Sequence, residues 1–453
     1  MKKITRELAG FAADLRYGLL DPDLIAKFKT YLLDAIGCAL HGTSQPWAQI
    51  VADYVKEQKG KREATLWLQN FRGPSANVAL GLGVMIHSFD FDDYHNAKIH
   101  PGAPVIPAAL SLGEAIGASG RDVLTAMVAG YETMIRVSLA TGPNASRLRG
   151  WHLTGTTGTF GAAAAAGNLL KLGADDMASA LGMAGTQSAG LWAFLADGAM
   201  SKRFHPGRAA QSGVMAAQLA CRGFRGPTQI LETEDGGFCR ATSDQIDLSL
   251  ITKDLGTAFM SGETNIKPYA CCASSHSAVD AILAIRKEHS FEVSDIEKVF
   301  VKTAAGVRVQ CGFPYRAKGV VEAQMSLQFI AAVVLTEGAA FPEQFSEAKI
   351  ADPSLMELAR RVEVVLDSDI DKLYPKRYPN RVEIILRDGR RFEVRIDFPK
   401  GSAAQPMSFD DVAAKFRSLA SFAVTADRAE RIVDTVDGLE ELEDIRELSV
   451  LLG

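Results

Sequence analysis

Residues 160–172 read FGAAAAAGNLLKL, and this run of small side chains decides what kind of fold the chain can form. Alanine has the highest helix propensity, and small side chains allow two helix axes to approach closely. The segment therefore predicts a helix in a compact multi-helix bundle. Its apolar part is broken by Gly167 and Asn168, well short of the roughly 20 residues that a membrane span needs.

The surrounding sequence continues the same pattern. From Asp21 to about Gly226, apolar residues recur at spacings of three and four and β-branched runs are few, which is typical of helices. We therefore predict an all-helical half. Residues 1–20 predict a further amphipathic helix, because charged residues interrupt the apolar ones before a signal-peptide core can form. The other helices are expected at 24–40, 75–87, 107–118, 121–141, 160–172 and 206–222.

The pattern changes after a helix expected at 277–289. Asp388-Gly389 is typical of a tight hairpin turn between two strands. Further helices are expected at 323–336 and 353–362. This alternation predicts an α/β domain whose sheet is covered on one face by helices. The short β-branched runs that predict its strands lie at 296–303, 362–366, 382–386 and 391–396.

A change in composition at 399–402 marks the end of this part. Ser408 and Asp411 then predict a capping box, after which the tail returns to helix. We expect these C-terminal helices to pack back onto the N-terminal ones. The predicted fold class is α plus α/β: a large, discontinuous helical domain (1–269 and 406–453) with a smaller α/β lid domain (270–405).

Composition narrows the classes of function. The 453 residues carry 49 Lys and Arg against 54 Asp and Glu, a net charge of -5, with no basic block. Neither nucleic acid nor a membrane surface is therefore an expected partner, and any anion must be bound by locally gathered cations. Six cysteines in a chain of this length are too sparse for a disulfide framework. We predict a protein of the reducing cytoplasm.

One stretch is unusually rich in groups that transfer protons. Residues 87–102, HSFDFDDYHNAKIHPG, hold three carboxylates and three imidazoles between two expected helices, the second with Pro107 in its first turn. Helix capping and metal binding are alternative interpretations. Because the spacing of a helical HExxH site is absent, acid–base catalysis is favoured over metal binding. The cysteine spacings do not fit an iron–sulfur cluster.

Three further motifs place a histidine or lysine before an expected helix. His152 lies in GWHLTGTTGTFG (150–161), which matches no phosphate-binding loop, and its glycines are explained by close helix packing. Lys202, Arg203 and His205 form a second group, for which a solvated basic turn is the alternative. Lys267 lies in NIKPYACCASSH (265–276), whose cysteines are typical of buried packing. Converging helix N-termini would favour a small polycarboxylate without a metal or cofactor.

These motifs together resemble those of the MmgE/PrpD family, whose activities include 2-methylcitrate dehydratase, cis-aconitate decarboxylase and iminodisuccinate epimerase. The resemblance implies a helical domain, an α/β lid and a cofactor-free site between them, usually in a homodimer. It extends along the chain and rests on residues 34–37, 87–93, 100–108 and 130–132, on His152 with 154–155, on Lys202 with His205 and Gly207, and on 267–269.

The resemblance also implies the site residues. His100 and His152 would be the base and acid, in an order that stays open, Asp90 would orient a histidine, and Lys202 and Lys267 would clamp carboxylates. No metal site is expected. The residues that we predict to bind the substrate are Tyr94, His95, Arg203, His205, Tyr269 and His276.

We therefore predict a lyase, a 2-methylcitrate dehydratase-like hydro-lyase, that removes water, or else carbon dioxide, from a small di- or tricarboxylic acid. Abstracting a proton beside a carboxylate creates negative charge, so such a site needs a base, an acid and fixed cations. The alternatives are an epimerase or isomerase of a small dicarboxylate, a carboxylate-binding homologue without turnover, and a metallohydrolase.

Four positions depart from the family pattern. Tyr94 stands where Thr or Ser is common, Leu82 replaces a frequent Asn, Ala270 replaces a Pro, and Phe329 occupies a position that is often Tyr. We expect Tyr94 and Phe329 to lie at the pocket and to change which substrate oxygens are hydrogen-bonded.

Overall fold

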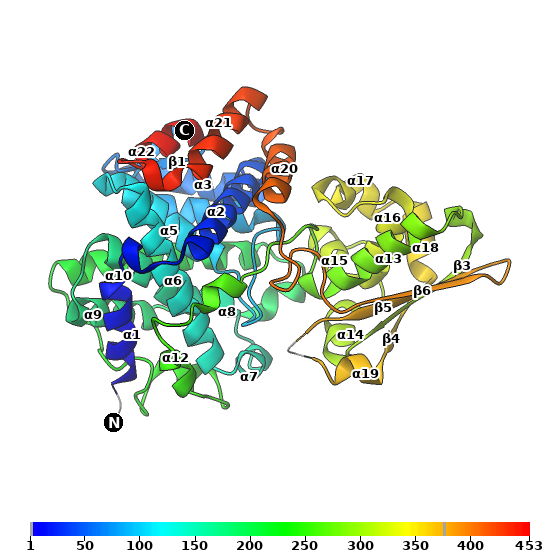
Figure 1. Cartoon of the computed structure of the whole chain (residues 1–453), viewed down its shortest axis with the longest axis horizontal. Helices are drawn as coiled ribbons and strands as arrows, with labels where there is room; N and C mark the ends of the chain where they lie inside the picture. Colours follow the sequence, from blue (N-terminus) through cyan, green and yellow to red (C-terminus); the bar gives the residue numbers. More distant parts are fainter. Residues whose placement is uncertain (1–2, 375–376) are drawn as a thin grey trace.

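The computed structural model describes residues 3–374 and 377–453, which are arranged around two hydrophobic cores (Figure 1). One core is formed by the N-terminal helices together with the last helices of the chain. The other surrounds a small sheet in the second half. Figure 1 shows the sheet at one end of the molecule and the helical part at the other.

The alanine-rich segment forms the centre of the helical part, as predicted. It belongs to α8 (Leu153–Leu169), in which every residue is buried. Small residues allow this close packing, since a Cβ atom added at Gly213 would lie only 2.4 Å from Cβ of Ala162. The helices packed around α8 are α5 (Gly102–Ile116), α6 (Gly120–Ala140), α9 (Ala174–Gly185) and α10 (Ser201–Cys221).

The remaining elements of this half enclose that centre. The prediction of an all-helical half is wrong at one place, where β1 (Ala64–Leu66) and β2 (Phe71–Gly73) form an antiparallel pair. Three residues are too few to show the alternation that marks a strand. The other helices are α1 (Ile4–Asp14), α2 (Pro22–Gly42), α3 (Pro46–Gln58), α4 (Ser75–Ile86), α7 (Pro143–Leu148), α11 (Phe238–Thr242) and α12 (Ser249–Thr252).

Three helices begin earlier than predicted. Helices α5 and α10 begin at Gly102 and Ser201, which places Pro107 and Pro206 inside them and not in their first turns. Helix α8 likewise begins at Leu153, directly after His152. An interior proline costs a backbone hydrogen bond, so sequence rules end or start a helix there. Here both prolines are buried, and tertiary packing outweighs that local preference.

Helix α6 is long and apolar enough to cross a membrane by length and composition alone. However, 94% of its most apolar window is buried inside the molecule. The physical explanation is that α6 is a core helix, packed against α8.

The second core is built on a four-stranded sheet of order β4-β3-β5-β6. The pair β3–β4 is parallel and the other pairs are antiparallel, with Val299 opposite both Val362 and Ile384. The hairpin predicted at Asp388-Gly389 is present between β5 and β6. The strands are β3 (Ile296–Thr303), β4 (Val362–Leu366), β5 (Asn380–Leu386) and β6 (Arg391–Ile396).

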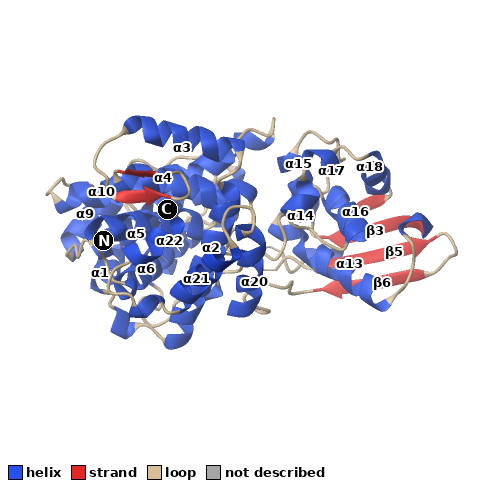
Figure 2. Ribbon diagram, turned by 90° about the horizontal axis from the view of Figure 1, so that it is seen from above, coloured by secondary structure: helices blue, strands red, loops and turns tan. Residues whose placement is uncertain are grey.

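Helices cover one face of the sheet (Figure 2), and alternate side chains of β5 are buried on this face. α13 packs on β5 and β6, and α16 packs on β4. The single helix predicted at 323–336 is two, because the chain breaks at Ser326, whose side chain caps the second. The helices here are α13 (His276–Glu288), α14 (Ala305–Cys311), α15 (Val320–Met325), α16 (Leu327–Glu337), α17 (Glu347–Ile350), α18 (Pro353–Arg360) and α19 (Ser368–Asp371).

The chain then returns to the first core. The predicted capping box of Ser408 and Asp411 starts α20 (Phe409–Ala420), which is followed by α21 (Ala426–Asp437) and α22 (Arg446–Leu452). Helix α20 lies so close to α2 that a Cβ atom at Gly37 would be 3.2 Å from Cα of Phe416. Domain boundaries at 269/270 and 405/406 stay a prediction.

Candidate active site

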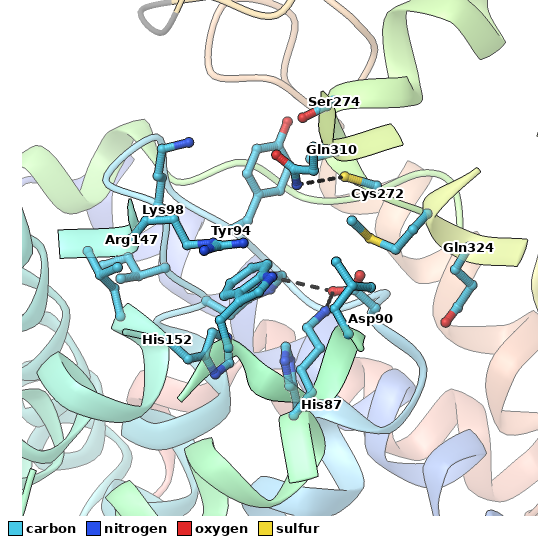
Figure 3. A pocket seen from close by; sticks show the side chains of 18 of the residues that line it. His87, Asp90, Tyr94, Lys98, Arg147, His152, Cys272, Ser274, Gln310 and Gln324 are labelled. Atoms are coloured by element: carbon cyan, nitrogen blue, oxygen red, sulfur yellow. Dashed lines mark hydrogen bonds and ion pairs between the residues drawn. The ribbon is translucent and has the colours of Figure 1, made fainter. Parts of the chain in front are cut away.

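A cavity lies where the two halves of the chain meet (Figure 3). The cavity volume is about 130 Å³. Its charged and polar lining in the first half comes from the loop at 87–100, from Arg147, from the starts of α8 and α10, and from Lys267. Residues of the second half, Cys272, Gln310, Gln324 and Tyr378, complete the wall.

Asp90 lies at the centre of a charge cluster. Its Oδ1 atom is 2.9 Å from Nζ of Lys202 and 3.0 Å from Nζ of Lys267. Lys267 also donates to the Asp90 carbonyl oxygen at 2.6 Å. Burial alone would raise the pKa of Asp90, but the two ammonium groups hold it well below its usual range. Burial opposes charge on Lys267 as well, yet Asp90 raises the pKa of that lysine. Lys267 therefore remains a cation.

His100 is held between two carboxylates. Its Nε2 atom is 3.6 Å from Oδ1 of Asp90, and its Nδ1 atom is 3.4 Å from Oδ2 of Asp92. Asp92 also accepts a hydrogen bond from Nδ1 of His87 at 2.9 Å. A carboxylate only accepts, so His87 carries its proton on Nδ1. Burial lowers the pKa of His87 to about 4, which keeps this ring neutral at pH 7.

His152 forms a pair with His205. Their Nδ1 atoms are 2.9 Å apart, so one ring must donate and the other accept. Burial lowers the pKa of His152 well below its usual range and that of His205 to about 4. Aromatic rings of Trp192 and Phe194 pack edge-on against His152. The pair is thus neutral, and it is packed in one orientation.

Helix starts bring these groups together. His100 directly precedes the Pro101 cap of α5, and its backbone N–H donates to Oγ1 of Thr154 in the first turn of α8 at 3.2 Å. Lys202 lies in the first turn of α10 and not before it, which corrects the predicted loop position. Three helix N-termini from one bundle therefore meet at the cavity.

Eight of the eleven predicted site residues line the cavity. His205, Tyr269 and His276 do not. His205 contacts two lining residues, His152 and Phe194. Tyr269 bonds to Asp280, and His276 contacts the carbonyl oxygen of Cys271 at 3.2 Å. The eight that line it are Asp90, Tyr94, His95, His100, His152, Lys202, Arg203 and Lys267.

Three of these eight have roles that the sequence did not show. Arg203 is buried, donates to the Ser88 carbonyl oxygen at 2.8 Å and stacks over Trp47, so its guanidinium is partly occupied. His95 accepts the backbone N–H of Ala97 at 3.1 Å. Tyr94 pairs through its backbone with Asn265 and directs its ring to the cavity (Figure 3).

Of the other departures from the family pattern, Phe329 is not a cavity residue, contrary to prediction. It is fully buried in the second core against Tyr315 and Phe345. Leu82 and Ala270 are also buried outside the cavity lining. Only Tyr94 among these positions can contact a ligand directly.

Sequence reasoning missed several cavity residues. His87 and Lys98 lie in the singled-out stretch but were not assigned roles. Arg147 lies in α7, outside every motif, and the one available signal is its place in a basic segment just before the His152 motif. Trp192 and Phe194 come from a short 3₁₀ helix, Trp192–Leu195, that has no chemical signature.

One group of side chains could hold a metal ion. His87, Asp90, Asp92 and His100 each offer a ligand atom, and these atoms lie within 4.8 Å of one another. Imidazole and carboxylate are ordinary ligands of zinc and similar ions. However, the ammonium groups of Lys202 and Lys267 already contact Asp90, and their charge opposes a further cation there. The donor set fits proton transfer better than a metal.

The protein thus combines a helical bundle with an α/β part, and carboxylate, imidazole and cationic side chains line the cavity where the two halves meet. The chain belongs to the MmgE/PrpD family. The family's N-terminal domain matches residues 6–250 and its C-terminal domain matches residues 269–441.

Curated relatives match along nearly the whole chain. A cis-aconitate decarboxylase-like protein of Aspergillus oryzae is 29% identical over 99% of this chain and 97% of its own length. The cis-aconitate decarboxylase of Aspergillus terreus is 29% identical over 95% of this chain and 91% of its own. The human cis-aconitate decarboxylase is 30% identical over 96% of this chain and 91% of its own.

Proposed function

We propose that this protein is a lyase that removes carbon dioxide from a small unsaturated tricarboxylic acid of the cis-aconitate type. The observation that carries the proposal is the cluster of Asp90, His100, Lys202 and Lys267 at one cavity wall. It supplies a proton-transfer group and fixed cations within one site. The names of the relatives favour decarboxylation over the dehydration predicted from the sequence.

The cations stabilise charge as it develops. When carbon dioxide leaves, the bond between the carboxyl carbon and its neighbour breaks, and the electron pair shifts the double bond along the chain. Negative charge then spreads toward a remaining carboxylate, where Lys202 or Lys267 can bind it. Preorganised cations at such a position are a large source of rate enhancement.

His100 completes the reaction by delivering a proton to carbon. The side chain of His100 is 15% exposed, whereas His152 is only 2% exposed and bonded to His205. His100 is therefore the better placed proton donor, and His152 serves as a neutral hydrogen-bonding partner of the substrate. The proton that His100 gives up is replaced from solvent. Asp90 and Asp92 orient the ring.

Dehydration of a 2-methylcitrate-type acid is the second candidate. It needs the same groups, with His100 taking a proton from carbon in place of giving one. The match to the family's two domains favours dehydration as much as decarboxylation, because that match does not distinguish substrates. A cofactor-free reaction, a homodimer and a cytoplasmic location belong to the same proposal.

Proton NMR in deuterated water separates these reactions. The purified protein is incubated with cis-aconitate, 2-methylcitrate, citrate and iminodisuccinate. We expect cis-aconitate to lose a carboxylate, with one deuteron in the product. Loss of water from a hydroxy acid would instead show a dehydratase, and deuterium entering a stereocentre without elimination would show an epimerase. Calorimetric binding without any product would show a carboxylate-binding protein without turnover.

A variant pair tests the role of His100 in the same assay. His100→Ala is expected to lower kcat by about 100- to 10,000-fold, the usual contribution of a positioned proton-transfer group. The matched control is His289→Ala, because His289 stacks on Phe392 at the sheet. It should keep full turnover. Near-wild-type turnover of the His100 variant would reject the assignment.

A further inference from the structure

Two cationic side chains line the cavity away from the cluster at Asp90. Lys98 comes from the loop before α5, and Arg147 from α7. In Figure 3 both lie on one side of the cavity and Asp90 lies on the opposite side. The proposed reaction does not use either residue.

Neither cation has a carboxylate partner. Across residues 3–374 and 377–453, no Asp or Glu oxygen lies within the 4.0 Å ion-pair distance of Lys98 or Arg147. Burial lowers the pKa of Lys98, and the nearby charge of Arg147 lowers it further. Burial also lowers the pKa of Arg147 to about 10, which leaves it charged at pH 7. By contrast, the neighbouring Arg149 pairs with Asp244 at 2.7 Å.

Both side chains are nevertheless held in place. The Lys98 backbone has φ +60°, a left-handed conformation that is unfavourable for a lysine. Its Nζ atom is 3.4 Å from Oη of Tyr374 and 5.6 Å from the centroid of that ring. The Arg147 guanidinium stacks 3.7 Å from the centroid of Trp192. Strained backbone and stacked cations in a cavity are typical of a preorganised binding site.

The charge balance of the lining indicates what is bound. One carboxylate, Asp90, faces five cationic side chains that line the cavity: Lys98, Arg147, Lys202, Arg203 and Lys267. Gathering like charges in a half-buried space is unfavourable unless an anion joins them. Since Lys98 and Arg147 lie across the cavity from Lys202 and Lys267, a single carboxylate would satisfy only one pair.

We propose that Lys98 and Arg147 bind a second carboxylate of the substrate, remote from the reacting end held by Lys202 and Lys267. The pair then restricts the substrates to small acids with two or more carboxylates separated along a carbon chain. An arginine matches a carboxylate through two parallel N–H donors, and lysine adds a point charge. The identity of the reacting end depends on the function proposed above. The second carboxylate site does not depend on it.

Calorimetry with a saturated tricarboxylate, propane-1,2,3-tricarboxylate, tests the site without turnover. Arg147→Met and Lys98→Met are each expected to raise its Kd by about 10- to 100-fold, the usual loss for a charged hydrogen bond. Arg147→Lys should recover part of that loss. The matched control is Arg149→Met, which removes an exposed arginine two residues away and should leave Kd unchanged. Circular dichroism checks that each variant folds.

The outcomes separate this inference from the lyase proposal. Unchanged Kd in both methionine variants would overturn the second carboxylate site, even if the wild-type protein turns over cis-aconitate. Weakened binding in these variants would support the site, even if no acid in the NMR panel is converted. A wild-type protein that does not bind propane-1,2,3-tricarboxylate would overturn it as well.

Discussion

At the scale of single residues, folding changes the ionisation of most of the histidines. Burial lowers the pKa of His87, His95 and His205 to about 4 and that of His276 to about 3. An unfolded histidine takes up its proton near pH 6.5. These histidines therefore favour folding fully above pH 6.5 and lose that contribution as the pH falls toward 4. The carboxyl groups whose pKa burial raises have the opposite sign, but they are fewer than the six histidines whose pKa burial lowers. These carboxyl groups are Asp34, with a pKa of about 6, and Asp93, Glu132 and Asp280.

A pH series of urea denaturation checks this sign. The free energy of unfolding should fall from pH 6.5 to 4.5. In His95→Asn, whose amide oxygen can still accept the Ala97 N–H, the fall should be shallower by about 1.4 kcal/mol per pH unit, the value of one proton. Equal slopes for the variant and the wild type, or a level profile, would contradict the prediction.

At the scale of elements, two glycines allow helix α10 to pack closely against α4, and this packing fixes the position of Lys202 at the cavity. Helices α4 and α10 touch at Gly83 and Gly207. A Cβ atom at Gly207 would lie 2.4 Å from the Leu80 carbonyl oxygen, and one at Gly83 would lie 2.6 Å from Cα of Gly207. Because backbone atoms block both positions, a methyl group at either would push the helices apart.

Gly207→Ala is therefore expected to cost about 1–3 kcal/mol in free energy of unfolding, as overpacked cores do. It should also lower kcat/KM, since Lys202 begins the same helix. Gly10→Ala is the matched control, because Gly10 lies in helix α1 with no atom within 4 Å of an added Cβ. It should stabilise by about 0.5–1 kcal/mol, the helix propensity difference. A Gly207 variant as stable and active as wild type would refute the packing argument.

At the scale of the whole molecule, one buried ion pair connects four distant segments. Nζ of Lys415 in α20 lies 2.6 Å from Oδ1 of Asp34 in α2 and donates to the carbonyl oxygens of Phe91 and Lys267 at 2.7 and 2.9 Å. The Lys415 and Asp34 side chains are 3% and 0% exposed. The C-terminal part of the chain thus supports both loops that carry the charge cluster.

Lys415→Met should destabilise the protein by about 3–5 kcal/mol, because it leaves the Asp34 charge buried without its partner. Adding Asp34→Asn should recover part of that loss. The control is Lys400→Met, which breaks an exposed pair with Asp411 and should cost at most about 1 kcal/mol. Urea denaturation measures all three. If Lys415→Met costs no more than the control, the buried pair does not hold these segments together.

The sequence predicted those site residues that lie in dense local motifs. Asp90, His100, Lys202 and Lys267 were predicted because each lies in a dense local motif, and all four line the cavity. Arg147 was missed because it lies outside every motif that the sequence singled out. His205, Tyr269 and His276 were assigned to the substrate because their motifs are close in sequence, yet none of them lines the cavity. His205 bonds to His152, Tyr269 bonds to Asp280, and His276 contacts the carbonyl oxygen of Cys271.

The sequence by itself determined the elements whose signal is local: the alanine-rich core helix, the strands with their Asp388-Gly389 hairpin, the Ser408 capping box and the dense group of carboxylates and imidazoles. Only the tertiary structure decided where α5 and α10 begin, that Asp90 joins two lysines from distant segments, and that Lys98 and Arg147 lie across the cavity from them. The physical reason is that propensity and periodicity act over one or two turns, whereas burial and charge pairing act between segments that only folding brings together.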